Sequence, residues 1–210
     1  ETDHAGRSFR FPGRFVRRSR SLTATRHRCL PTSMHLFIAE RLCVTVESVD
    51  FHNPNRPQDG RECGARLELR FVERDGLPGS IYVSRALTLA RAICRFDLLE
   101  SAPGAQDRVH WHPAMENGEA FKRLYDEDLS RDPLGWLGER LRDGVRTLEL
   151  GGVEDAGRFA VDAEVLAESA DAIVAETAAT LDGLRRDGWP PVFARDERGM
   201  ALRAPSGSAS

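Results

Sequence analysis

The chain has 210 residues, of which 40% are hydrophobic and 30% are charged, and its formal net charge is −3. This apolar fraction is enough for a hydrophobic core, which excludes a wholly disordered chain, and four cysteines are too few for a disulfide-dense scaffold. No segment approaches the ~20 consecutive apolar residues of a membrane-spanning helix. We therefore expect one domain of ordinary size and no membrane segment.

The positive charge is concentrated at the N-terminal end. Residues 1–33 carry a net charge of +6, which leaves −9 for residues 34–210. The acidic body argues against nucleic acid as its partner, because binding to phosphates requires a basic face. A nucleic-acid-binding head formed by residues 1–33 stays open as an alternative. Since this head is rich in Arg and Ser and has no steady apolar period, it is predicted to be disordered or non-native, with Met34 as the suspected start.

Strand patterns fill the first half of the predicted domain. Apolar residues alternate with polar ones in His35–Phe51 and in Ala65–Glu73, as in strands with one face in the core. A short third strand is expected at Ser80–Ser84. The apolar spacing in residues 85–92 is ambiguous and suits two helical turns.

The clearest β pattern is a hairpin with strands at Ile93–Leu99 and Asp107–His112, around a loop rich in turn-forming residues. If the loop is symmetric, residues whose numbers sum to 207 face each other, which puts Phe96 opposite Trp111 on an apolar face. The opposite face is polar, and we expect it to meet water. Its members are Arg95, Asp97, Arg108, His110 and His112.

After Pro113 the apolar period becomes helical. Helices are predicted at Ala120–Leu129, from an N-cap at Asp132 to Gly144, and from about Asp162 to Gly188. Strands followed by helices predict an α+β fold, in which an antiparallel sheet from the N-terminal half carries the C-terminal helices on one side. The domain is predicted to span residues 34–193, with a disordered tail at 194–210.

The cysteines stand at positions 29, 43, 63 and 94 with no CxxC spacing, so a zinc cluster of the ribbon type is not expected. Cys43 and Cys94 fall in apolar strand patterns and are predicted to be small buried hydrophobes. Because no export segment is recognisable, we expect a reduced, cytoplasmic protein.

The hairpin carries the candidate chemistry. Two histidines separated by one residue share a face of a strand, so His110 and His112 could bind one divalent transition-metal ion, with Glu116 as a third ligand. Asp97, opposite His110, would then fix the orientation of that imidazole. The pattern Gly104-x5-His110-x-His112-x3-Glu116 resembles the first motif of the cupin family, and the resemblance implies the same three ligands inside a small β-barrel.

Besides the nucleic-acid-binding head, three functions remain open for residues 34–210. The first is a non-catalytic binding or interaction module for an unidentified protein partner or small ligand. The second is a small metal-dependent enzyme or sensor built on His110, His112 and Glu116. The third is a metal-free ligand pocket in which Asp97 and His110 act as an acid–base pair or Arg95 holds an anion. No catalytic residue is assigned.

Overall fold

The structure is a computed structural model that describes residues 34–52, 60–74, 86–187, 194–195 and 201–202. The Arg-rich head and the strand expected at Ser80–Ser84 therefore lie outside the described residues. Within the described part, no helix combines the length and the apolar character needed to cross a membrane.

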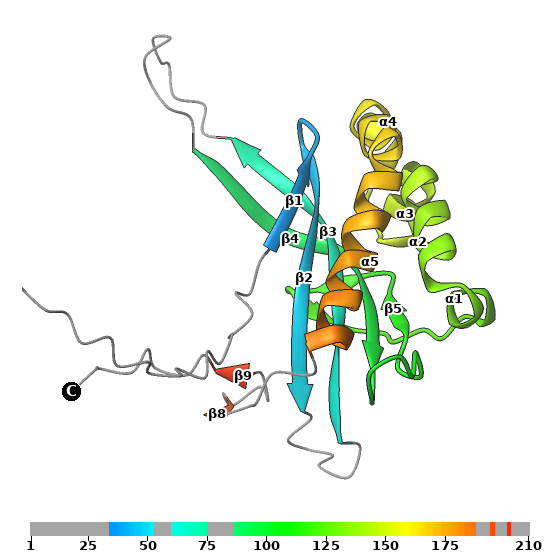
Figure 1. The fold of residues 1–210 in the computed structure, drawn as a ribbon. Helices are drawn as coiled ribbons and strands as arrows, with labels where there is room; N and C mark the ends of the chain where they lie inside the picture. The colour runs from blue at the N-terminus through cyan, green and yellow to red at the C-terminus, as the bar shows by residue number, and fades with distance from the viewer. Residues whose placement is uncertain (1–33, 53–59, 75–85, 188–193, 196–200, 203–210) are drawn as a thin grey trace, which may run out of the picture.

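A five-stranded antiparallel sheet forms the centre of the fold (Figure 1). Its strands lie side by side in chain order, and each pairs with the next one along the chain. This meander consists of β1 (Met34–Ile38), β2 (Leu42–His52), β3 (Arg61–Arg74), β4 (Leu87–Glu100) and β5 (His110–His112).

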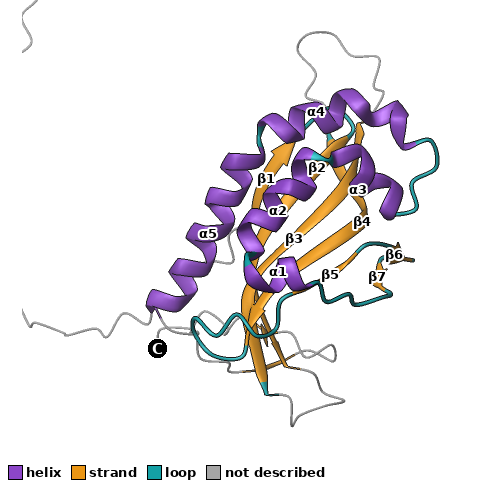
Figure 2. Cartoon of the chain, turned by 90° about the vertical axis from the view of Figure 1, so that its right-hand side faces the viewer, coloured by secondary structure: helices purple, strands orange, loops and turns teal. Residues whose placement is uncertain are grey.

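Helices cover one face of this sheet, and Figure 2 shows them as a layer in front of the strands. They are α1 (Glu127–Arg131), α2 (Pro133–Arg142), α3 (Gly144–Leu150), α4 (Ala160–Glu168) and α5 (Ala170–Asp187), with a 3₁₀ helix at Ala156–Phe159. The predicted α+β class, with helices packed on one side of an N-terminal antiparallel sheet, is confirmed.

Two small strand pairs complete the described structure. One is formed by β6 (Met115–Glu116) and β7 (Glu119–Ala120), and the other by β8 (Ala194–Arg195) and β9 (Ala201–Leu202). The second pair lies within residues 194–210, which the sequence analysis assigned to a disordered tail.

A row of apolar side chains forms the core beneath the helices. The register places Val46, Leu67, Phe96 and Trp111 side by side across β2 to β5, and all four are buried. Trp136 of α2 packs edge-on against this row, with its ring centroid 5.3 Å from that of Trp111 and 5.9 Å from that of Phe96. These contacts fix the helix layer to the sheet.

The ambiguous segment 85–92 is largely strand, and one helix prediction is wrong at its start, because strand pairing prevails over local pattern. Residues 87–92 belong to β4, where Leu89 pairs with Val72 of β3. The helix expected at Ala120–Leu129 begins only at Glu127, with Asp126 as its N-cap. Before that cap, Leu124 forms a β-bridge with Trp111 at the outer edge of β5.

The remaining helix predictions hold in part. Asp132 caps α2 by accepting a hydrogen bond from the Gly135 N–H, and Pro133 takes the first helical position, as predicted. The single long helix expected from Asp162 is instead α4 and α5, which meet at Ser169. The Ser169 hydroxyl donates to the Val165 carbonyl at 3.0 Å, a local bond of the kind that bends helices.

Candidate metal centre

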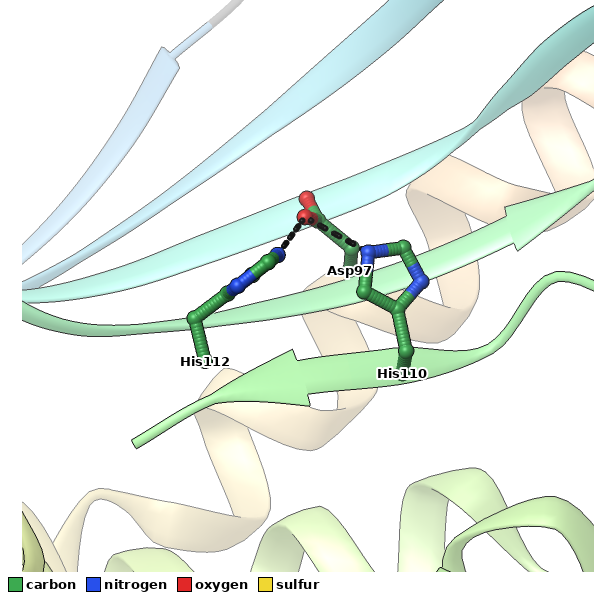
Figure 3. Close-up of side chains that lie close together, drawn as sticks. All are labelled: Asp97, His110 and His112. Atoms are coloured by element: carbon green, nitrogen blue, oxygen red, sulfur yellow. Dashed lines mark ion pairs between the residues drawn. The ribbon is translucent and has the colours of Figure 1, made fainter. Parts of the chain in front are cut away.

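The β4–β5 hairpin places three side chains that could bind metal on the sheet face opposite the helices. The predicted register is confirmed, because Asp97 pairs with His110, Phe96 with Trp111 and Arg95 with His112. Since side chains alternate along a strand, Asp97, His110 and His112 point away from the helix layer. Figure 3 shows both imidazoles directed at the Asp97 carboxylate.

The expectation that this polar face meets water is wrong. The exposed fraction is 2% for Asp97, 1% for His110 and 6% for His112. Strand alternation identifies which residues share a face, but it carries no information on whether that face is covered. Because burying a charge is costly unless the charge is paired, the electrostatic partners of these residues decide what the face can do.

Ion pairs extend from the three side chains across the sheet. The Arg66 Nε donates a hydrogen bond of 2.7 Å to Oδ1 of Asp97, and Glu47, Arg66 and Asp97 form one cross-strand row. Buried Glu68 accepts a hydrogen bond of 2.7 Å from Arg95 and a further one from Arg70. Arg95, a predicted ligand-binding residue, is thus bound to Glu68.

Main-chain carbonyl groups determine which nitrogen of each imidazole carries a proton. His110 Nδ1 lies 2.8 Å from the Arg108 carbonyl oxygen, and His112 Nδ1 lies 2.9 Å from that of Lys122. A carbonyl oxygen only accepts hydrogen bonds, so each Nδ1 carries a proton and donates it. Each Nε2 is therefore the atom that faces Asp97, and in a neutral ring it carries a lone pair.

The distances from each Nε2 atom to the Asp97 oxygen are those of ligands around one ion. His110 Nε2 and His112 Nε2 lie 3.3 Å and 3.5 Å from Asp97 Oδ2, and the ligand atoms of this group all lie within 4.8 Å of one another. Tetrahedral ligands about 2.0–2.1 Å from a zinc ion are about 3.4 Å apart. Both nitrogen–oxygen distances therefore match a metal site whose donors are two imidazoles and one carboxylate.

Asp97 is ionised in this structure. Burial by itself would raise the pKa of Asp97, but the contacts with His110 and His112 and the positive charge of Arg66 outweigh it and hold that pKa well below its ordinary value. At neutral pH the side chain is therefore a carboxylate. Arg66 occupies Oδ1, which leaves Oδ2 as the oxygen that faces the histidines.

Glu116, the predicted third ligand, is exposed on β6 and does not belong to this group. Asp97 takes the corresponding place in the structure. The sequence contained the signal for this, because the hairpin register already set Asp97 opposite His110, although Asp97 was predicted to orient that imidazole or to act with it as an acid–base pair and not to bind the metal ion.

A cleft of about 220 Å³ lies on the helix side of the hairpin, between the β4–β5 loop and helices α1, α2 and α5. Its charged lining residues are paired with protein groups: Glu100 accepts hydrogen bonds from Arg185 and from the Gly104 N–H, and Asp132 caps α2. Because the charged residues of this cleft already bind protein groups, it is a weaker candidate for a ligand site than the group of Asp97, His110 and His112.

Comparisons with protein-family models, curated proteins and solved structures found no significant match to this chain. The resemblance to the first cupin motif stays a prediction, and the interpretation of the site depends on its own geometry.

Proposed function

We propose that this chain binds a divalent transition-metal ion through Asp97, His110 and His112. The observation that carries the proposal is the convergence of both Nε2 atoms on one carboxylate oxygen, while both Nδ1 atoms donate to main-chain carbonyls. Histidines that bind metals typically use their second ring nitrogen in this way, because the outer hydrogen bond fixes the tautomer and the ring orientation.

The charge of the group supports a metal ion over a metal-free network. Two neutral imidazoles would direct lone pairs at an anionic oxygen, which is repulsive. If both rings were protonated, two imidazolium ions and Arg66 would surround the single carboxylate of Asp97 in a buried site. A metal ion uses both nitrogen lone pairs and the carboxylate as ligands, so each inward-facing atom gains a favourable partner.

The donor atoms limit which metal ions the site can bind. Imidazole nitrogen suits zinc, copper, iron, cobalt and nickel, whereas calcium and magnesium take oxygen ligands. The spacing of about 3.4 Å that tetrahedral geometry requires favours Zn²⁺, with Co²⁺ as its spectroscopic substitute.

Three protein ligands leave one tetrahedral position open, which is typical of metal sites that act on a substrate or sense a ligand rather than of structural zinc sites with four protein ligands. This supports the small metal-dependent enzyme or sensor over the non-catalytic interaction module. The absence of a nucleic-acid partner for residues 34–210 and the cytoplasmic location stay predictions from the sequence.

The test is metal binding by the full chain after removal of metal with a chelator. We expect the wild type to retain about one equivalent of Zn²⁺ after desalting, measured by inductively coupled plasma mass spectrometry. The double variant His110→Ala/His112→Ala and the variant Asp97→Asn should each lose it. His35→Ala is the matched control, since His35 of β1 forms an imidazole–carboxylate contact of 3.3 Å with Glu176 of α5 and is not one of the proposed ligands.

Glu116→Gln separates the two possible carboxylate ligands, and we expect it to retain zinc. Circular dichroism of each variant distinguishes loss of metal from loss of fold. A wild-type chain that is folded and retains no zinc or cobalt would overturn the proposal in favour of a metal-free charged network.

A further inference from the structure

We infer that the open position of this metal site takes an oxyanion, a carboxylate or phosphate group of a small ligand, and that Arg66 binds it as a second point of attachment. The inference rests on the proposed function, because it needs the metal ion. It identifies the chemical class of what the site recognises.

The first argument is the number of ligands. Among the residues that the structure describes, the group of potential metal-binding side chains contains Asp97, His110 and His112 and no fourth member. A tetrahedral ion held by three protein ligands completes its coordination with water or an exogenous ligand. The open position would therefore take water or an exogenous ligand.

The second argument is the balance of charge. Arg66 pairs with Asp97, Arg70 and Arg95 share Glu68, and Glu47 lies opposite Arg66 in the next strand; with neutral histidines and an ionised Glu47 the charges of these six residues cancel. A divalent ion adds two positive charges to a buried region. An uncompensated buried charge is costly, so the loaded site favours an anion over a neutral water molecule.

The third argument is the state of the three arginines. Arg95 directs Nε and Nη2 to Glu68, and Arg70 binds both Glu68 and the Ala90 carbonyl. Arg66 differs, because it donates only its Nε to Asp97, and neither of its Nη groups makes a hydrogen bond to a described residue. Arg66 thus has unused donors beside the metal-binding carboxylate.

Arg66 is the most exposed of the four residues of the proposed site. The three ligands are almost fully covered, whereas the Arg66 side chain is 16% exposed. An oxyanion that enters there would meet the Nη groups, whose planar fork suits two oxygens of a carboxylate or phosphate, and could place a further oxygen on the ion.

The test uses the full chain loaded with Co²⁺ and desalted, since the visible absorption of cobalt reports its ligands. Acetate and inorganic phosphate are the two probes, and chloride at matched ionic strength is the control. We expect acetate, phosphate or both to shift the spectrum saturably, with chloride having no such effect. In Arg66→Gln the apparent Kd for the active probe should rise at least about tenfold, the effect of losing one charge-assisted attachment.

Arg70→Gln is the matched control, because it removes an arginine from the same face that does not contact Asp97, and it should keep the wild-type Kd within about twofold. Metal content, measured on the same samples, separates the two proposals. Two results would overturn the proposed oxyanion binding and leave the proposed metal site intact. One is a cobalt spectrum that neither probe changes, and the other is an Arg66→Gln variant that binds the probes as tightly as the wild type. A chain that takes up no metal would overturn both proposals.

Discussion

The two faces of the central sheet are built from neighbouring residues yet are buried in different ways. On the helix side, an apolar row crosses four strands and consists of Val46, Leu67, Phe96 and Trp111. The chain neighbours of these residues form a polar row on the opposite face, which consists of Glu47, Arg66, Asp97 and His110. The apolar row is stabilised by removal from water, whereas Asp97 and His110 are equally covered and depend on electrostatic partners. Burial alone therefore does not identify a hydrophobic core.

The same contrast appears in the titration of two neighbouring groups on β4. Burial raises the pKa of the Cys94 thiol on the helix side to about 12, while contacts with the two histidines and the charge of Arg66 overcome burial and hold the pKa of Asp97 well below its ordinary value. The helix side thus disfavours charge, and the opposite side stabilises it.

The largest expected effect lies in the apolar row. Phe96→Ala removes a buried ring that stacks on Trp111 and packs edge-on against Trp136, and it should lower the free energy of unfolding by about 3–5 kcal/mol in urea titrations. The control Phe121→Ala, at a residue that is 68% exposed, should change it by less than about 0.5 kcal/mol. Similar losses in both variants would mean that the aromatic contacts do not hold the helices to the sheet.

A smaller effect is expected in the charged network. Glu68→Gln leaves Arg70 and Arg95 without their shared carboxylate, and it should cost about 2–3 kcal/mol, less than a fully buried pair, because both arginines reach water. Glu149→Gln, which removes the exposed partner of Arg146, should cost less than about 0.5 kcal/mol. Equal chemical-denaturation midpoints for these two variants would show that the charged face is no more than an ordinary surface.

The smallest effect is a dependence on pH. Because the pKa of the Cys94 thiol is raised by folding from 9.0 to about 12, its contribution to stability is complete below pH 9 and is lost as the pH rises above that value. Between pH 8 and pH 10 this should remove about 1.4 kcal/mol. The measurement is the difference in pH dependence between the wild type and Cys94→Ala, and two parallel profiles would contradict the raised pKa.

The sequence was most informative where local pattern and structure agree. The polar–apolar alternation in residues 93–112 predicted the hairpin register because a slip by one residue would have reversed every side chain. Cys43 and Cys94 are buried, as their apolar surroundings indicated. The Asp132 cap and Pro133 likewise located the start of α2, since both act within one turn.

What the sequence could not provide depends on contacts between distant residues. Residues 87–92 became a strand because β3 pairs with them, and the covering of the polar face left no mark in its alternation. The candidate site was half predicted: both histidines were identified by their spacing, but Asp97 was passed over as a ligand in favour of Glu116, which is nearer in sequence to the histidines and far more exposed.

All three proposed ligands lie within residues 97–112, on two strands joined by one loop. Closing a loop of this length costs little conformational entropy compared with closing one between distant segments. The Lys122 carbonyl that holds His112 and the Arg66 side chain that holds Asp97 also precede every helix of the described chain. During synthesis the residues of the proposed metal site thus leave the ribosome before any helix of the described chain, so an ion could bind the growing chain and act as a nucleus for folding.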